Sequence, residues 1–518
     1  MKPYEEIPAI GAPIPADRQG AKRHYGVHPY FTRRPFNVVK RYIEHYSRKG
    51  DRVLDPFGGS GVTAIEAFLS NRVGIHNDIN PLANFITEGI ADLARGDVAG
   101  YRKALEEISD RCERRVQALD DMDDVAVASL LEGLPLPENV RLPANADVHF
   151  YYDLFSPRQL AGLAMIRQAV EDISNQYARS AMRLAWSATL AKVNRTFLSA
   201  EGRAESRGGS SIFSIYRYKV AAKPVELPCW RTFHERAQNV LAAKAEIDQV
   251  IAYQRTTGGF AGRIEIHDRD IEELPDRIRP VDYIFTDPPY GAHISYIDLS
   301  TLWNVWNGML PTEQERHREL IVGGDLGLSE DVYVSRLSQS IQTCFALLKP
   351  GRWLSVVFQH WSVAYFDAIL TAAAVAGGDL RAAISQIGDP IWSMHKKKGN
   401  QSVLAGEMIL TFLNTGTPKA VDSAKPFDVE AAVARVSRES SSGAIYGEYL
   451  FNRIIIEAWQ AGALGSLDVS RTAFAELMVR QGWSYDQAKH QWCRQGPSHT
   501  LLAGLPSETV KRDHEKGP

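Results

Sequence analysis

A glycine-rich turn between a short apolar strand and a helix constrains the fold more than any other feature of the sequence. The stretch DRVLDPFGGSG, residues 51–61, begins with the apolar pair of a buried strand and ends in closely spaced glycines. Residues 62–71, VTAIEAFLSN, then have a helical pattern, and residues 72–78, RVGIHND, form a second strand that ends in Asp78. Strand, turn, helix and strand make up a βαβ unit, so the sequence predicts an α/β fold with a Rossmann-like, doubly wound sheet.

The alternation of strands and helices stops and later resumes. Long helical patterns replace it after about residue 95, and it returns at residue 263 with the strand GRIEIHDRD. This connection is far longer than the usual link between neighbouring elements, which indicates an insertion. The expected division is an N-terminal arm at 1–24, a catalytic domain at 25–95 plus 260–416, a large helical insertion at 96–259 and a helical C-terminal appendage at 420–518.

Composition excludes several classes of protein. The 518 residues are 44% hydrophobic and 23% charged with a formal net charge of −3, which is typical of a globular chain and not of a disordered or histone-like one. The four cysteines form no CxxC pair, so a disulfide framework and a zinc ribbon are disfavoured and no metal site is expected. No apolar run is long enough to span a membrane, and the first residues lack a secretory apolar core, so we expect a cytoplasmic protein.

The glycine-rich turn is the first candidate ligand site. Its glycines allow a ligand to approach the backbone closely, and the Asp78 carboxylate after the next strand can accept hydrogen bonds from a ribose diol. The spacing is not GxGxxG, and no Lys-Ser/Thr pair follows as in a P-loop, so NAD and ATP are less favoured. The acid Asp55 ahead of the glycines suits a cationic ligand such as a sulfonium amino acid.

The second motif is Asp287-Pro288-Pro289-Tyr290, which follows the hydrophobic strand VDYIFT at 281–286. By itself, this four-residue match is explained better by a proline-stiffened loop with a surface tyrosine. Its place at the carboxyl end of a strand in the same α/β domain changes that interpretation, because ligands bind at this edge of such sheets. We therefore expect the two motifs to meet at one site.

Together the two motifs resemble those of the amino-group DNA methyltransferases, which use S-adenosylmethionine and make N6-methyladenine or N4-methylcytosine. The resemblance covers residues 28–95 and 263–360. The segment HPYFTRRP, residues 28–35, resembles the family's HPxxKP segment, which lines the cofactor pocket, although the family's basic residue is usually lysine.

Two further segments resemble cofactor-binding motifs of the family. Asp78-Ile79-Asn80-Pro81 is similar to a variant of the ribose-binding motif. Asp270 lies in a segment whose acid approaches the cofactor adenine in the family, with Asp268 as a rival for that role. The cofactor-binding residues that the resemblance implies are Phe31, Thr32, Asp55, Pro56, Phe57, Gly58, Gly59, Ser60, Gly61, Asp78, Ile79 and Asp270.

The resemblance assigns the chemistry to residues 287–290. The Asp287 carboxylate and the Pro288 carbonyl would accept hydrogen bonds from the target amine, the Pro288-Pro289 pair would stiffen the corner, and Tyr290 would stack on a flipped-out base. Transfer would be a direct in-line displacement without a covalent intermediate. Cytosine C5 methylation needs a thiolate nucleophile, and Cys229 in the only Pro-Cys pair lies outside the α/β pattern, so we expect a structural cysteine there.

A basic segment with interleaved aromatic residues, 192–223, is the candidate nucleic-acid surface. Arginines and lysines beside aromatic rings suit phosphate neutralisation and base stacking, while a solvated loop explains the same pattern. A second basic cluster, HKKKGNQ at 395–401, is equally compatible with a solvated hairpin. The candidate nucleic-acid-binding residues are Arg195, Arg203, Arg207, Arg217 and Lys219.

The sequence hypothesis is a site-specific DNA adenine-N6 methyltransferase acting on double-stranded DNA, with a restriction or phage-defence protein as a possible partner. Asp rather than Ser before the PPY sequence favours adenine over cytosine N4, by resemblance. Three alternatives remain open: a DNA cytosine-N4 methyltransferase; an RNA guanine-N2 methyltransferase, because Gly291 extends the motif to DPPYG; and a non-catalytic nucleic-acid-binding subunit on a methyltransferase scaffold.

Overall fold

The computed structural model of the chain describes most of the sequence. The described residues are 2–17, 23–198, 209–220, 224–291, 294–386, 407–439, 444–445, 447–486 and 491–494.

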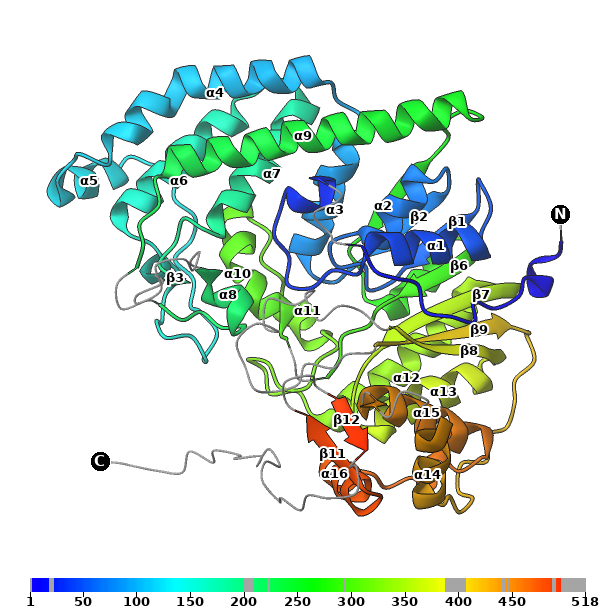
Figure 1. Cartoon of the computed structure of the whole chain (residues 1–518). Helices are drawn as coiled ribbons and strands as arrows, with labels where there is room; N and C mark the ends of the chain where they lie inside the picture. The colour runs from blue at the N-terminus through cyan, green and yellow to red at the C-terminus, as the bar shows by residue number, and fades with distance from the viewer. Residues whose placement is uncertain are drawn as a thin grey trace, which may run out of the picture.

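A seven-stranded sheet forms the centre of the described structure (Figure 1). Its order is β5-β2-β1-β6-β7-β9-β8; the strands from β5 to β7 are parallel, and β9 runs antiparallel between β7 and β8. The chain runs outward from β1 to β5 on one side and from β6 to β7 on the other, so the order reverses between β1 and β6. The strands are β1 (Arg52–Asp55), β2 (Val73–Asn77), β5 (Arg263–His267), β6 (Val281–Thr286), β7 (Leu348–Phe358), β8 (Gly378–Gln386) and β9 (Glu407–Asn414).

Both faces of the sheet are buried, as a doubly wound fold requires. Every residue of β6 is buried, and its side chains alternate between two hydrophobic clusters: Tyr283 and Phe285 belong to one, Ile284 to the other. The first cluster includes helices α1 (Phe36–Tyr46), α2 (Val62–Leu69) and α3 (Pro81–Leu93); the second includes α12 (Glu330–Leu347) and α13 (Val363–Val375). The α/β, Rossmann-like doubly wound fold expected from the sequence is confirmed.

The insertion forms a helical layer on the first face of the sheet. Its helices are α4 (Val98–Ala118), α5 (Asp124–Leu131), α6 (Pro157–Glu171), α7 (Gln176–Leu190), the short α8 (Ser211–Ser214) and α9 (Cys229–Thr256). Trp303 on α10 (Tyr296–Asn307) donates from Nε1 to the Ser187 carbonyl on α7 at 3.1 Å. The insertion thus shares a core with the central sheet. A two-residue ladder of β3 (Phe197–Leu198) and β4 (Gly209–Ser210) accompanies its helices.

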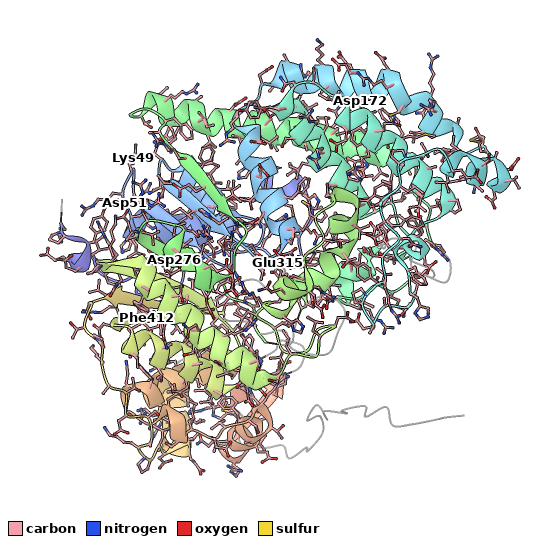
Figure 2. The ribbon with its side chains drawn as sticks, turned by 180° about the vertical axis from the view of Figure 1, so that it is seen from behind. Lys49, Asp51, Asp172, Asp276, Glu315 and Phe412 are labelled. Carbon is pink, nitrogen blue, oxygen red and sulfur yellow. The ribbon has the colours of Figure 1, made fainter. Side chains whose placement is uncertain are left out.

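The C-terminal region packs on the opposite face. Figure 2 shows this arrangement from behind, with Asp172 at the end of α6 in the helical layer and Phe412 on β9 in the other half of the molecule. The region has the expected helices α14 (Val429–Glu439), α15 (Gly447–Gln460) and α16 (Arg471–Arg480). It also has a three-stranded sheet of β10 (Ala444–Ile445), β12 (Gln491–Arg494) and β11 (Trp483–Asp486), which the sequence did not predict because runs of two to four residues carry no clear period.

The described part of the N-terminal arm lies against the sheet. The Tyr4 ring lies between the guanidinium groups of Arg48 and Arg352, at 3.9 and 3.3 Å from its centroid. Its hydroxyl donates to Asp51 at 2.6 Å, and its carbonyl accepts from Trp353 Nε1 at 2.8 Å. These contacts hold the arm at the start of β1 and on β7. Among the described helices, none is long and apolar enough to cross a membrane.

Gly61, which caps the N-terminus of α2, allows a test of whether the turn requires glycine. Its φ is +80°, and a Cβ at this position would lie 2.3 Å from Thr87 Oγ1 on α3. We expect Gly61→Ala to lower the free energy of unfolding by about 2–4 kcal/mol, through backbone strain and overpacking together.

Gly50→Ala is the matched control. Gly50 has a φ of +88° with nothing within 4 Å of its Cβ position, so the loss should be about 1 kcal/mol. The two losses are measured as shifts in the midpoint of denaturant-induced unfolding. Equal shifts would contradict the predicted contact with Thr87.

Candidate functional site

A cavity opens at the carboxyl ends of the parallel strands, where the strand order reverses. Its lining comes from the ends of β1, β2, β5 and β6 and from the segment before α1. Ten of the residues that the sequence predicts to bind a cofactor line it: Thr32, Asp55, Pro56, Phe57, Gly58, Gly59, Ser60, Asp78, Ile79 and Asp270.

The glycine turn forms the floor of this cavity. The backbone NH of Gly58 donates to the Asn77 carbonyl at 2.9 Å, which ties the turn to the end of β2. A Cβ at Gly58 would lie 2.1 Å from His76 Nδ1, so only glycine fits there. Gly61 does not line the cavity; it sets the direction in which α2 leaves the turn.

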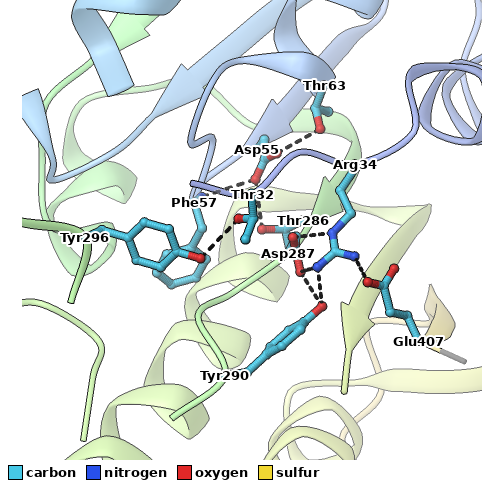
Figure 3. Close-up of polar contacts among 10 residues, drawn as sticks. All are labelled: Thr32, Arg34, Asp55, Phe57, Thr63, Thr286, Asp287, Tyr290, Tyr296 and Glu407. Atoms are coloured by element: carbon cyan, nitrogen blue, oxygen red, sulfur yellow. Dashed lines mark hydrogen bonds and ion pairs between the residues drawn. The ribbon is translucent and has the colours of Figure 1, made fainter. Parts of the chain in front are cut away.

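The Asp55 carboxylate joins the two sequence motifs. Its Oδ2 accepts from Thr63 Oγ1 on α2 at 2.8 Å, and its Oδ1 accepts from Thr286 Oγ1 on β6 at 2.9 Å (Figure 3). Thr286 directly precedes Asp287, so the turn and the diproline corner are held together through one side chain. Burial raises the pKa of Asp55 to about 7, although the two threonine hydroxyls oppose this shift.

Asp78 is held by the backbone on both sides. Its Oδ2 accepts from the Gly59 NH at 2.8 Å and its Oδ1 from the Asn80 NH at 2.8 Å. Burial raises the pKa of Asp78 to about 6. Each oxygen has capacity for one more hydrogen bond, as recognition of two vicinal hydroxyls needs.

The structure separates the two rival acids after β5. Asp270 lines the cavity, caps the short 3₁₀ helix at Ile271–Asp276 by accepting from the Glu272 NH at 3.1 Å, and lies 3.7 Å from Arg318 Nε. Asp268 does not line the cavity, and its side chain is 72% exposed beside Arg269.

The segment before α1 contributes differently from the prediction. Phe31 does not line the cavity; its ring packs among Phe213, Tyr296 and Trp303 in the core shared with the insertion. Thr32 does line it, and its hydroxyl lies 3.1 Å from that of Tyr296.

The predicted catalytic corner follows β6. Asp287 and Pro289 line the cavity, Pro288 is buried, and Tyr290 lies beside them with its ring edge-on to Phe358 at 5.1 Å. The Tyr290 hydroxyl donates to Asp287 Oδ1 at 2.6 Å. The structure therefore brings the corner and the glycine turn to one cavity, as the sequence predicts.

Arg34 is the most prominent residue that the sequence reasoning missed. Its Nη2 donates to Asp287 Oδ1 at 2.9 Å and to the Tyr290 hydroxyl at 2.6 Å, its Nε donates to Asp287 Oδ2, and its Nη1 pairs with Glu407 (Figure 3). The sequence could have identified Arg34, because it stands in HPYFTRRP where the similar segment of the family has its basic residue. Glu407 had no such signal, because only the fold brings the start of β9 to this corner.

Glu319 and Asn77 were also missed. Glu319 lines the cavity and accepts from the Ile297 NH at 3.0 Å and the Ser295 hydroxyl at 3.2 Å; burial raises its pKa to about 8. Asn77 bridges the turn and β5, because its Nδ2 donates to the carbonyls of Pro56 and Arg269 at 3.0 Å. Neither residue lies in a motif that sequence spacing distinguishes.

Cys229 lies outside the cavity. It is the first residue of α9, and burial raises the pKa of its thiol well above the ordinary range. A buried neutral thiol is a poor nucleophile.

The basic segment is only partly described. Arg203 and Arg207, like the cluster at 395–401, lie outside the described residues. Arg195 donates to the Asp153 carbonyl at 3.2 Å, Arg217 pairs with Asp147 at 2.6 Å, and Lys219 is exposed.

Tyr218 fixes the stretch around Arg217 and Lys219. Its hydroxyl donates to the Leu299 carbonyl at 2.6 Å and accepts from the Leu302 NH at 3.0 Å, both on α10. Because α10 begins at Tyr296, which lines the cavity, these basic residues lie in a stretch that Tyr218 joins to the helix bordering the cavity.

Comparison with known proteins shows what the chain is similar to. Residues 13–85 match the family model of the N6 and N4 methyltransferases, described as "DNA methylase". The chain is similar to the type II methyltransferase M.MjaII of Methanocaldococcus jannaschii, with 20% identity over 344 residues, which span 54% of this chain and 62% of that protein. It also aligns with the crystal structure of TrmN from Thermus thermophilus at 11% identity and a TM-score of 0.25, over 73% of this chain and 48% of that one; this likeness is too weak to support the fold.

The two sequence matches support a likeness to the amino-group methyltransferases, and the chain spans 62% of the length of the curated relative. Members of this family generally use S-adenosylmethionine, and the matched residues include the glycine turn and Asp78.

Asp270 and Asp268 form a matched pair for testing the cavity. We expect Asp270→Asn, which keeps an acceptor for the 3₁₀ cap, to weaken S-adenosylmethionine binding about tenfold or more, the size of a lost charge-assisted hydrogen bond. Asp268→Asn should leave the affinity unchanged. Isothermal titration calorimetry measures both, and a loss confined to Asp268→Asn would contradict the assignment.

Proposed function

We propose that the chain transfers a methyl group from S-adenosylmethionine to the N6 amine of adenine in double-stranded DNA. The observation that carries the proposal is the single hydrogen-bonded connection from the glycine turn through Asp55 and Thr286 to Asp287. It holds a candidate donor site and a candidate acceptor site against one cavity.

The cavity fits the cofactor chemically. Asp78 offers two fixed carboxylate oxygens for a ribose diol, and the Gly58–Gly59 backbone allows close approach. The carboxylates of Asp55 and Asp78 favour a cation, and pairing with the sulfonium would in turn lower the pKa values that burial has raised. Bound there, S-adenosylmethionine supplies the electrophilic methyl group.

The protein's own groups perform the rest of the chemistry. The exocyclic amine of adenine is a weak nucleophile, because its lone pair is delocalised into the ring. Asp287 and the Pro288 carbonyl would each accept a hydrogen bond from one of the two amine N–H groups and draw the nitrogen toward tetrahedral geometry. The lone pair would then attack the methyl carbon in line as the carbon–sulfur bond breaks to leave a neutral thioether, and the cationic methylated nitrogen would lose its proton to solvent. A base inside a duplex cannot reach this corner, so flipping is part of the proposal.

Gly291 does not favour the RNA guanine-N2 alternative. Its φ is +67°, and a Cβ would lie 3.0 Å from the Tyr365 ring. The glycine that extends the motif to DPPYG therefore has a local structural cause.

The helical insertion at 96–259 is proposed as the DNA target-recognition region, and a restriction or phage-defence protein as a partner. The contact of Tyr218 with α10 supports the first assignment, because it joins the basic stretch of the insertion to the cavity wall. A cytoplasmic location is part of this proposal.

Asp287→Ala tests the proposed activity directly. We expect it to abolish transfer of labelled methyl groups to duplex DNA while leaving the cofactor affinity within roughly tenfold, because the carboxylate contacts the amine and not the sulfonium.

Controls in the same assay separate the alternatives. Modified-base sequencing of DNA from an expressing host identifies adenine N6 or cytosine N4 as the product. Labelling of tRNA alone by the wild-type protein would reject the DNA substrate, and labelling of neither nucleic acid would reject methyl transfer to either.

The double variant Arg217→Ala/Lys219→Ala tests the DNA surface. Each phosphate contact contributes about 0.9 to the slope of log affinity against log salt concentration, so the slope should fall by up to about 2.

Lys103→Ala/Arg114→Ala is the matched control for charge. Both residues are exposed on α4, at the top of the insertion in Figure 1 and far from α8. An equal change of slope in both double variants would place the DNA elsewhere.

A further inference from the structure

Arg34 joins three segments that are distant in the sequence. It lies two residues before α1, directly ahead of Pro35, and it contacts Asp287 after β6 and Glu407 at the start of β9. The three side chains are only 16%, 20% and 30% exposed. An ion pair shielded from water to this degree orients its partners more strictly than one on the surface.

The hydrogen bonds around Asp287 are unequal. Among the described residues, Oδ1 accepts from Arg34 Nη2 and from the Tyr290 hydroxyl, whereas Oδ2 accepts from Arg34 Nε. A carboxylate has capacity for about four hydrogen bonds, two on each oxygen. The remaining capacity is therefore on Oδ2, the oxygen that the Arg34 fork holds in place.

We infer that Arg34 is a positioning residue for methyl transfer: its fork fixes the Asp287 carboxylate so that Oδ2 accepts a hydrogen bond from the target amine. This inference rests on the proposed function. A planar bidentate guanidinium can impose this orientation, and a lysine ammonium, which acts as a point charge, cannot.

The charged groups around Asp287 determine how readily its carboxylate is protonated. Asp287 faces Arg34, Glu407, Tyr290 and, through Thr286, Asp55. Burial raises the pKa of Asp287, Arg34 opposes that shift, and Glu407 adds to it. Only the ionised carboxylate accepts with both oxygens, so loss of Arg34 should extend the protonated, inactive form to higher pH.

Single-turnover methylation rates measured across pH test the inference. For Arg34→Met we expect a methylation rate about 10²-fold lower at neutral pH. The acid limb of the pH–rate profile, where protonation of Asp287 lowers the rate, should move to higher pH by about one unit or more. For Arg34→Lys, which restores charge but not the fork, the acid limb should stay near that of the wild type while the rate remains about tenfold low.

Glu407→Gln gives a shift of opposite sign. It removes a carboxylate that raises the pKa of Asp287, so the acid limb should move to lower pH. This variant keeps the shape of the side chain, so it tests the inference even if Arg34→Met does not fold.

Two outcomes would overturn the inference: an Arg34→Met rate and pH profile equal to the wild type, or an acid limb in Glu407→Gln that stays or moves upward. A wild-type protein that transfers no methyl group to DNA would instead reject the proposed function itself.

Discussion

The buried carboxylate of Asp55 is the interaction on which the site depends. It lies at the end of β1, next to the point where the strand order reverses, and it accepts hydrogen bonds from α2 on one side and β6 on the other. Without those two threonine donors, a carboxylate this deeply buried would be destabilising. With them, the turn expected to bind the cofactor and the corner expected to bind the base are joined by one side chain, so their separation does not depend on a flexible loop.

The insertion is part of this arrangement and not an added layer. Trp303 and Tyr218 connect α10 to the insertion, and the first residue of α10, Tyr296, lines the cavity. A change in the insertion on binding DNA would therefore reach the cavity wall through a helix that is packed on both sides. Such a direct route suits an enzyme in which target recognition and methyl transfer must be coupled.

The charged groups of the cavity divide into two sets. Burial raises the pKa values of Asp55, Asp78 and Asp287; a cationic ligand would lower those of Asp55 and Asp78 again, whereas Arg34 is a permanent partner that opposes the shift of Asp287. The first set is thus suited to binding a sulfonium, and the second to keeping one acceptor ionised and oriented. The HPYFTRRP segment supplies Thr32 to the cavity and Arg34 to the corner, so one short stretch serves both sets.

Local signals in the sequence determined the βαβ unit, the two motifs and their meeting at one sheet edge. A short apolar strand followed by a glycine turn or by Asp-Pro-Pro is compatible with few other local structures. Ten of the twelve predicted cofactor residues line the cavity for this reason. Of the other two, Phe31 packs in the core and Gly61 caps the N-terminus of α2. Only the tertiary structure decided that Arg34 meets Asp287 and Glu407, that Thr286 meets Asp55, and that Asp270 rather than Asp268 faces the cavity. Contacts between residues hundreds of positions apart depend on strand order and side-chain direction, and no periodic pattern in the sequence predicts either of them.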